Sequence, residues 1–465
     1  MLLLRRIVFY VFVALYLFLC PLVISYALGY WIRPGTVQGL VKTGLISLST
    51  SPRGATVYVG KSRYTQQTPT VLRDMLPGQY LITLVLAHHK PWRHLMPVEA
   101  ERATALDHIL LLPESVKPRQ LLSGPFDDVV PLSGTELFLL VPGSHSEPWV
   151  VYNWREETAW PLLPDDAVFR EARILSYFTA DESQALLLHV RTKDGERFVW
   201  LEGKEPQPHL EDLTNLFLGR PRLVTWDSGA ARHLFVFQHG YLNRVDRISK
   251  AMVPRFLEHV RGFGVFQKSL YVLRDGPDFF RMDEEGRHQD SLLHELEFDP
   301  RFFGGKGVFQ IKVVSKDLIL FWGEQGELLA NRLADRVAEK GVLGLAVDPE
   351  RERVLFWQKD RLGLLEPFEG SQEIAPFKED IARRWIFERG ERIQQAFWVY
   401  EGSHVLFRDG NQVLLFPLEA SGAPDAQGLV RVKRHSSVGY VERTGTLYYL
   451  DESTGNLSSI EVLPP

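Results

Sequence analysis

Cysteine is almost absent from this chain, and its scarcity excludes two kinds of site. The only cysteine among 465 residues is Cys20, so the chain can form no internal disulfide and no metal site with several cysteine ligands. A long basic block is also missing, because 53 basic and 58 acidic side chains are interspersed and the net charge is -5. Nucleic acid is therefore not an expected partner.

The common catalytic signatures are missing as well. The chain has no Gly-x-Ser-x-Gly nucleophile elbow, no phosphate-binding loop and no dinucleotide fingerprint. The neighbours His88 and His89 follow an expected strand and would point to opposite faces of it. The other histidines considered lack the short spacings of zinc ligands: His145, His189, His239 and His435. We expect no enzyme activity, no cofactor and no metal site.

Adjacent acids are the remaining candidates for chemistry. The pairs Asp127-Asp128 and Asp165-Asp166 contain the two carboxylates that a glycosidase needs, but a glycosidase holds them at a fixed separation that sequence does not provide. The turn at Asp194-Gly195 resembles the Asp-box of sialidase-type propellers, yet it lacks the residue between Asp and Gly. An ordinary hairpin turn and solvated loop acids are the simpler interpretations.

A long apolar run near the N-terminus is the first positive feature. The 26 residues from Ile7 to Ile32 carry no charge, which is enough to cross a hydrocarbon core as a helix. Arg5 and Arg6 precede the run, which favours a cytoplasmic N-terminus under the positive-inside rule. We expect a single-pass bacterial inner-membrane protein whose bulk is periplasmic or otherwise extracytoplasmic, with Tyr30 and Trp31 at the outer interface.

Two other interpretations of this run remain open. A cleavable signal peptide has a shorter apolar core, although Ser25 and Ala27 form a small-x-small pair that a peptidase recognises. A lipoprotein signal would require a small residue before Cys20, where this chain has Leu19. We expect an uncleaved anchor over residues 1–33.

The segment after the run predicts a small β-domain over residues 44–114. In SPRGATVYVG, Ser51 to Gly60, Pro52 and Gly54 mark a turn between two short strands and indicate a hairpin. A second turn at Pro77-Gly78 leads into a strand whose side chains alternate. Four or five strands within about seventy residues are typical of a small β-sandwich.

The order of these turns resembles the PEGA domain, a small extracytoplasmic β-domain named for its Pro-Glu-Gly-Ala turn. The corresponding residues here are Pro52, Arg53, Gly54 and Ala55, so Arg replaces the Glu. The resemblance implies an envelope location and an interaction or spacer role, and it implies no catalytic residue.

The remainder, residues 120–465, repeats one sequence pattern: an apolar strand, a polar turn, a second apolar strand, another turn and a third strand. The first apolar residues of the middle strands lie roughly 36 to 51 residues apart, as propeller blades require: Leu137, Leu186, Leu234, Leu270, Leu318, Val354, Val405 and Leu447. Seven or eight blades fit, since the first or last copy can complete a blade across the ring closure.

These repeats resemble the blades of TolB-like and WD40-like propellers, without the Trp-Asp and Gly-His pairs of true WD40 repeats. A pair of β-sandwiches is the alternative. Helices are also expected at PRFLEHVRGF, residues 254–263, and at FKEDIARRWIFERGERI, residues 377–393.

The sequence therefore predicts an all-β protein: a membrane helix, a PEGA-like sandwich and a seven- or eight-bladed propeller. The expected function is an envelope binding or scaffold protein that acts through a protein partner. The alternative is a protein that binds or acts on carbohydrate or cell-wall glycan, for which aromatic side chains, 12% of the chain, could supply stacking surfaces.

Overall fold

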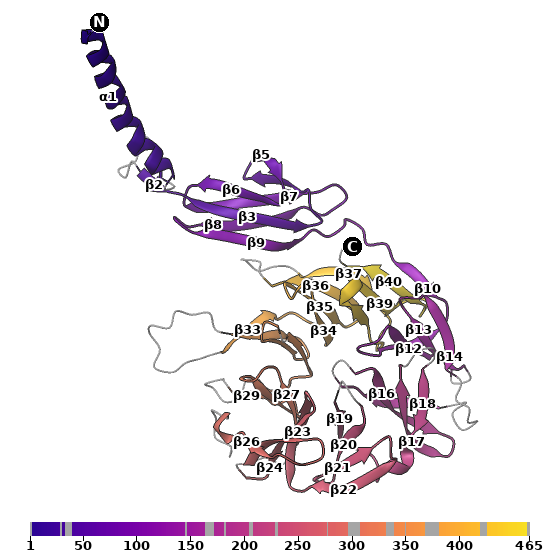
Figure 1. Cartoon of the computed structure of the whole chain (residues 1–465). Helices are drawn as coiled ribbons and strands as arrows, with labels where there is room; N and C mark the ends of the chain where they lie inside the picture. The colour runs from indigo at the N-terminus through magenta and orange to yellow at the C-terminus, as the bar shows by residue number, and fades with distance from the viewer. Residues whose placement is uncertain are drawn as a thin grey trace.

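A computed structural model gives the architecture of the chain (Figure 1). It describes residues 2–27, 30–32, 40–144, 147–162, 172–180, 183–203, 208–227, 231–276, 278–295, 307–331, 339–348, 350–367, 381–418 and 426–462. Nearly all of the regular structure is β-strand, as expected. The one long helix among the described residues stands apart from two bodies built of sheets.

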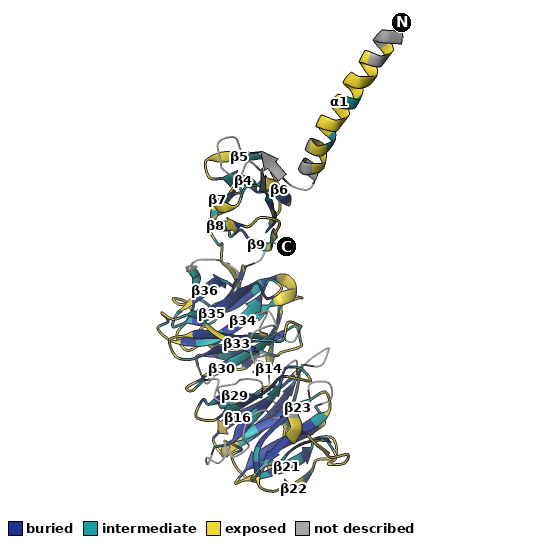
Figure 2. Cartoon of the chain, turned by 90° about the vertical axis from the view of Figure 1, so that its left-hand side faces the viewer, coloured by how far each residue is buried: buried dark blue, intermediate teal, exposed yellow. Residues whose placement is uncertain are grey.

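Helix α1 spans Leu2–Ala27, and its described side chains are mostly exposed (Figure 2). The helix begins before Ile7 and ends before Ile32, so it differs from the expected run at both ends. The last residues of the run form β1 (Tyr30–Ile32) instead, which pairs with β2 (Leu40–Lys42) in a small antiparallel ladder. Tyr, Trp and Ile favour strands, which agrees with this pairing. Over the described residues, no helix combines the length and apolar character needed to cross a membrane.

The next body is a sandwich of two sheets. One has the order β6-β3-β9 and the other β5-β4-β7-β8. The strands are β3 (Gly44–Ser51), β4 (Thr56–Val59), β5 (Ser62–Gln67), β6 (Thr70–Met75), β7 (Gly78–Val85), β8 (Trp92–Val98) and β9 (Ala103–Leu110). Alternate side chains of both sheets fill one core, including Ile46, Leu48, Val57, Ile82 and Leu84, all fully buried.

The expected hairpin at Pro52 is wrong, because β3 and β4 belong to different sheets. Gly54 has φ 90°, and its N–H donates to the Thr68 carbonyl at 2.8 Å. The Ala55 N–H donates to the Thr68 Oγ1 at 2.9 Å. These bonds fix an arch that carries the chain from one sheet to the other, and Arg53 remains exposed on it.

The second body consists of four-stranded units, here called blades. Blade 1 contains β11 (Phe126–Pro131), β12 (Leu137–Pro142), β13 (Trp149–Asn153) and β14 (Thr158–Leu162). Blade 2 contains β15 (Arg173–Phe178), β16 (Ala185–Thr192), β17 (Gly195–Glu202) and β18 (His209–Asp212). Blade 3 contains β19 (Leu223–Trp226), β20 (His233–Gln238), β21 (Tyr241–Asp246) and β22 (Ala251–Leu257). Blade 4 contains β23 (Val260–Phe266), β24 (Ser269–Arg274), β25 (Asp278–Asp283) and β26 (Asp290–Ser291).

Blade 5 has three strands among the described residues: β27 (Phe309–Val313), β28 (Ile319–Gly323) and β29 (Leu328–Ala330). Blade 6 contains β30 (Gly344–Asp348), β31 (Arg353–Trp357), β32 (Leu362–Pro367) and β33 (Ile381–Phe387). Blade 7 contains β34 (Ile393–Val399), β35 (His404–Asp409), β36 (Gln412–Pro417) and β37 (Gln427–Arg431). Blade 8 contains β38 (Gly439–Val441), β39 (Thr446–Leu450), β40 (Leu457–Glu461) and, as its outer strand, β10 (Arg119–Leu122).

Apolar cores between successive blades close the ring. Each pair of neighbours, from blades 1 and 2 to blades 7 and 8, shares one cluster of buried side chains. An eighth cluster joins blade 8 to blade 1, where Tyr448, Leu450 and Leu457 pack against Phe126 and Phe138. The described residues thus form an eight-bladed β-propeller, and β10 ties the start of the ring to its end.

The helices expected at residues 254–263 and 377–393 are not present. Pro254 to Leu257 lie in β22, Val260 to Phe263 in β23 and Ile381 to Phe387 in β33, where each strand pairs with a neighbour in its blade. Residues 377–380 lie outside the described residues. Cross-strand pairing and burial in the ring outweighed the local helical pattern.

The sandwich packs at the rim of the ring, beside blades 7 and 8 (Figure 1). Leu110 of β9 is 5% exposed and belongs to the core that blades 7 and 8 share. The His108 ring lies edge-on to that of Tyr400 at 5.9 Å, and the His108 Nδ1 is 3.6 Å from the Glu401 Oε2. The junction therefore combines one buried apolar side chain, Leu110, with polar contacts.

Candidate functional site

A cavity of about 270 Å³ opens between blades 1 and 2. It lies at the end of the blades where β12 turns into β13, and we call this side of the ring the cavity face. The lining combines acidic, basic, hydroxyl and aromatic side chains: Asp127, Asp128, Ser144, Glu147, Trp149, Arg173, Ser176 and Tyr177, with apolar neighbours.

Asp127 and Asp128 both line this cavity, although neighbours on a regular strand would point to opposite sides. The register of β11 against β12 shifts between Phe126 and Asp128, so Asp127 is a bulge residue. The Asp127 carboxylate accepts a hydrogen bond from the Lys433 Nζ at 2.8 Å and is about half exposed. Of the two acid pairs singled out in the sequence, this one is brought together, whereas Asp165 and Asp166 lie outside the described residues.

Asp128 is half-buried and is the less exposed member of the pair. Burial raises the pKa of Asp128, although the N–H groups of Ser437 and Val129, which donate to its Oδ1 at 2.6 and 2.8 Å, act in the opposite direction. Nearby, burial lowers the pKa of Arg408 to about 10, against the attraction of Asp128. The Arg408 guanidinium donates to the carbonyls of Gly410 and Lys433. Blades 1, 7 and 8 are thereby connected beside the cavity.

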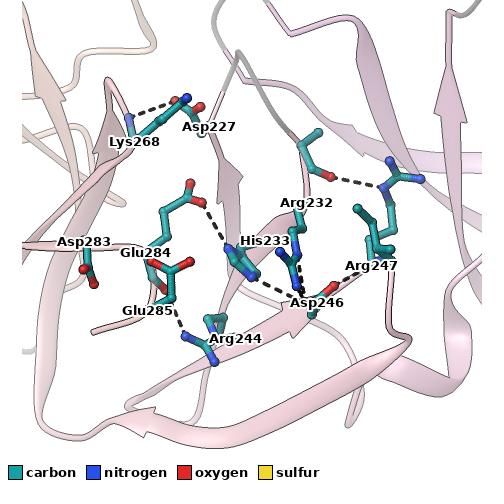
Figure 3. Close-up of polar contacts among 12 residues, drawn as sticks. Asp227, Arg232, His233, Arg244, Asp246, Arg247, Lys268, Asp283, Glu284 and Glu285 are labelled. Atoms are coloured by element: carbon teal, nitrogen blue, oxygen red, sulfur yellow. Dashed lines mark hydrogen bonds and ion pairs between the residues drawn. The ribbon is translucent and has the colours of Figure 1, made fainter. Parts of the chain in front are cut away.

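A second polar cluster joins blades 3 and 4 on the opposite side of the ring, where β19 turns into β20 (Figure 3). The His233 ring lies between two carboxylates, with its Nδ1 3.1 Å from the Glu284 Oε2 and its Nε2 3.6 Å from the Asp246 Oδ2. Burial raises the pKa of Glu284, and its Oε1 is buried without a hydrogen-bond partner among the described residues. Burial also opposes ionisation of Asp246, but hydrogen bonds from Arg232 and nearby backbone N–H groups hold its pKa well below the usual range.

This cluster connects two blades at three places. The His233 of blade 3 contacts the Glu284 of blade 4, the Arg244 guanidinium donates to the Glu284 carbonyl at 3.1 Å, and the Lys268 N–H donates to the Asp227 Oδ1 at 3.2 Å. An imidazole between carboxylates can relay a proton, but the described contacts of the cluster include no nucleophile. No group of three metal-binding side chains occurs among the described residues. The geometry therefore indicates a clamp between blades.

The histidines noted in the sequence are placed separately. His189 is buried in β16, where its Nε2 lies 2.8 Å from the Glu196 Oε2 and its ring stacks on Phe198. His239 and His435 are exposed in turns, and His145 lies outside the described residues. His88 is exposed and His89 half-buried in the turn that follows β7. Of the residues expected at a membrane interface, Arg5 is exposed on α1, whereas Tyr30 and Trp31 lie in β1.

His233 and Glu284 were missed as a pair in the sequence because 51 positions separate them. Each lies at a strand end next to a turn, in a segment that resembles every other blade. The packing of blade 3 against blade 4 brings them together.

Comparison with known proteins identifies the first of the two bodies. Residues 43–111 match the PEGA domain family, close to the expected 44–114. No curated protein matches the chain. Similar solved structures include BamB from Moraxella catarrhalis, with 11% identity, a TM-score of 0.42 and coverage of 75% of this chain and 99% of that chain.

Two further solved structures are similar to this chain at the same low level. The Cps50 (Swd1) β-propeller domain from Myceliophteria thermophila has 10% identity, a TM-score of 0.37 and coverage of 75% of this chain and all of that chain. An oligogalacturonate lyase in complex with manganese has 13% identity, a TM-score of 0.36 and coverage of 75% and 98%. Scores this low add no argument about function. The chain contains a PEGA domain followed by a β-propeller, and the interfaces between its own blades establish the ring.

Proposed function

We propose that this chain is a binding scaffold of the cell envelope, anchored to a membrane by its N-terminal segment and acting through a protein partner on the cavity face. The observation that carries the proposal is the way the PEGA domain is joined to the ring. The PEGA contacts Tyr400 and Glu401 lie in the turn from β34 to β35. In a ring of uniformly oriented blades, that turn is on the side opposite the cavity.

Among the described residues, this placement keeps the PEGA domain off the cavity face, which is the side that we assign to a partner. A rigid ring whose loops form a recognition surface suits binding, and attachment to a membrane raises the effective concentration near other envelope proteins. The uncharged run Ile7 to Ile32 and the exposed apolar side chains of α1 support the anchor. The PEGA match supports an extracytoplasmic location.

Fractionation tests the anchor. Full-length protein should remain with membranes after a carbonate wash and should be digested by protease added to spheroplasts. Release by carbonate, or protection of the PEGA domain and propeller while an external control is digested, would contradict the anchor or its orientation.

A second candidate function, glycan binding, is favoured by the cavity itself. Its carboxylates Asp127 and Asp128 lie beside the aromatic residues Trp149 and Tyr177, and such a mixture suits a hydroxyl-rich ligand. Pull-down of the purified full-length protein on cell-wall sacculi tests this function. Glycan binding predicts that the wild-type protein is retained on the sacculi and that Asp127→Asn reduces this retention. The Asp127 side chain is about half exposed, and asparagine has nearly the same shape. Equal retention of both proteins would exclude the cavity as the glycan site.

A further inference from the structure

The outward face of the PEGA sheet β5-β4-β7-β8 exposes apolar side chains. Along β7 and β8 the inward residues, such as Ile82 and Met96, are buried. The outward residues Leu81 and Leu95 are 45% and 54% exposed, and they are direct cross-strand partners. Val85 is 37% exposed on the same side. Exposed apolar side chains that lie side by side on one face of a sheet, as Leu81 and Leu95 do, indicate a contact with something outside the chain.

The same face is cationic. The strands β4, β5, β7 and β8 contain no Asp or Glu, and their only arginines are Arg63 and Arg93. The pairing places these arginines in one row across the sheet, Arg63 opposite Tyr58, then Thr83, then Arg93. Both arginines are exposed. The surface therefore complements a partner that is both anionic and apolar.

The apolar part of this face lies near the point where the chain arrives from α1. The pair Leu81 and Leu95 is three positions from the pair Gly78 and Val98, which corresponds to about 10 Å along the strands. Gly44, the first residue of β3, packs directly beside Val98. The acids at this end are engaged in ion pairs, Glu99 with Arg102 and Glu101 with Lys42.

We propose that this face rests on an anionic lipid surface, with Leu81 and Leu95 at the headgroup boundary and Arg63 and Arg93 on lipid phosphates. Interfacial proteins combine apolar and basic side chains in this way. The inference rests on the proposed membrane anchor, because the anchor brings this end of the PEGA domain to the bilayer. It adds a second, charge-dependent contact that orients the domain and hence the propeller.

The test uses the full-length chain in lipid nanodiscs, with Cys20→Ser and a bimane label on Pro97→Cys. Pro97 is exposed on the same face and lies two positions after Leu95 along β8. The discs contain phosphatidylcholine alone, or with one quarter phosphatidylglycerol, and a lipid that carries a nitroxide quencher near the headgroup. We expect quenching in the anionic discs, little quenching in the neutral discs, and loss of quenching at high salt, which screens the attraction.

Charge reversal supplies the matched control. The double variant Arg63→Glu/Arg93→Glu should lose the quenching, whereas Arg73→Glu, an exposed change on β6 of the other sheet, should retain it. Equal quenching in both lipids, or quenching unaffected by the double variant, would overturn the proposal. Absence of quenching in anionic discs would also overturn it and leave the face available to an acidic protein. Failure of the chain to remain with the discs would instead refute the anchor, and the lipid contact with it.

Discussion

His404 shows how one buried side chain makes stability depend on pH. It begins β35 beneath the PEGA contact, is 8% exposed, and pairs with the Ser403 hydroxyl at 2.9 Å. Burial, aided by the nearby His108, lowers the pKa of His404 to about 4. The folded protein therefore keeps this imidazole neutral under conditions in which the unfolded chain takes up a proton.

The sign of the pH effect follows from this shift. Above pH 6.5, the ordinary pKa of histidine, the imidazole is neutral in both the folded and the unfolded protein, and His404 causes no loss of stability. As the pH falls from 6.5 toward 4, the unfolded state is protonated first, and about 3 kcal/mol of stability is lost. Urea unfolding of wild type and His404→Gln near neutral pH and near pH 4 measures this loss. The variant should show a smaller loss, and an equal loss would assign the acid sensitivity to other groups.

His233 provides a residue-level test of the clamp between blades 3 and 4. We expect His233→Ala to lower the free energy of unfolding by about 1–3 kcal/mol, because Glu284 would remain buried without its partner. His239→Ala, in an exposed turn of the same blade, is the matched control and should have almost no effect. Similar effects of both changes would show that the clamp adds no stability.

At the scale of elements, a glycine permits blades 4 and 5 to touch. The first strands of these blades pair in parallel at Gly262 and Phe309. A Cβ added to Gly264 would lie 2.0 Å from the Ile311 carbonyl oxygen, where backbone cannot readily move away. The seven-stranded sheet that unites the two blades depends on this close approach.

Gly264→Ala should therefore destabilise the protein by about 1–3 kcal/mol, as overpacking does. Gly307→Ala is the control, because nothing lies within 4 Å of its added Cβ and its φ is not positive. Thermal unfolding of the two variants distinguishes these cases. A melting temperature of Gly264→Ala equal to that of Gly307→Ala would contradict the tight contact.

The middle strands of the blades could be predicted from sequence, and the reason is physical. Seven of the eight marker residues, Leu318 excepted, lie in the second strand of their blades, and Leu318 directly precedes β28. These strands are buried on both faces, so they are continuously apolar.

The outer strand β10 could not be predicted, because its four residues are half-buried or exposed and its partner β40 is more than 330 positions away. The PEGA turn was recognised, but its residues do not indicate which sheet each strand joins.

At the scale of the whole molecule, Leu110 connects the PEGA domain to the ring. Leu110→Asp places a charge in the core of blades 7 and 8. We expect faster proteolysis between residues 112 and 118 and a loss of about 2–4 kcal/mol of stability. Leu218→Asp, at a position 64% exposed on the ring, is the control. Cleavage at the same rate in both variants would show that Leu110 does not hold the two bodies together.

The candidate site could be anticipated only in part. Asp127 and Asp128 were recognised as a pair, but the bulge that turns both toward one cavity depends on the pairing of β11 with β12. Lys433, Ser437 and Arg408 enter the same region from blades 7 and 8, about 300 positions away. Such a site forms only when blades 7 and 8 pack beside blade 1, so no local sequence motif predicts it.

The most direct test of the proposed scaffold is in-cell photocrosslinking of the full-length protein, followed by mass spectrometry. Benzoylphenylalanine replaces either Arg173, exposed at the rim of the cavity, or Ile248, 69% exposed in the turn from β21 to β22 on the opposite side. The account predicts that one recurrent envelope protein is captured from position 173 and not from position 248. Capture of no protein above background from position 173, or the same capture from both positions, would contradict binding through the cavity face.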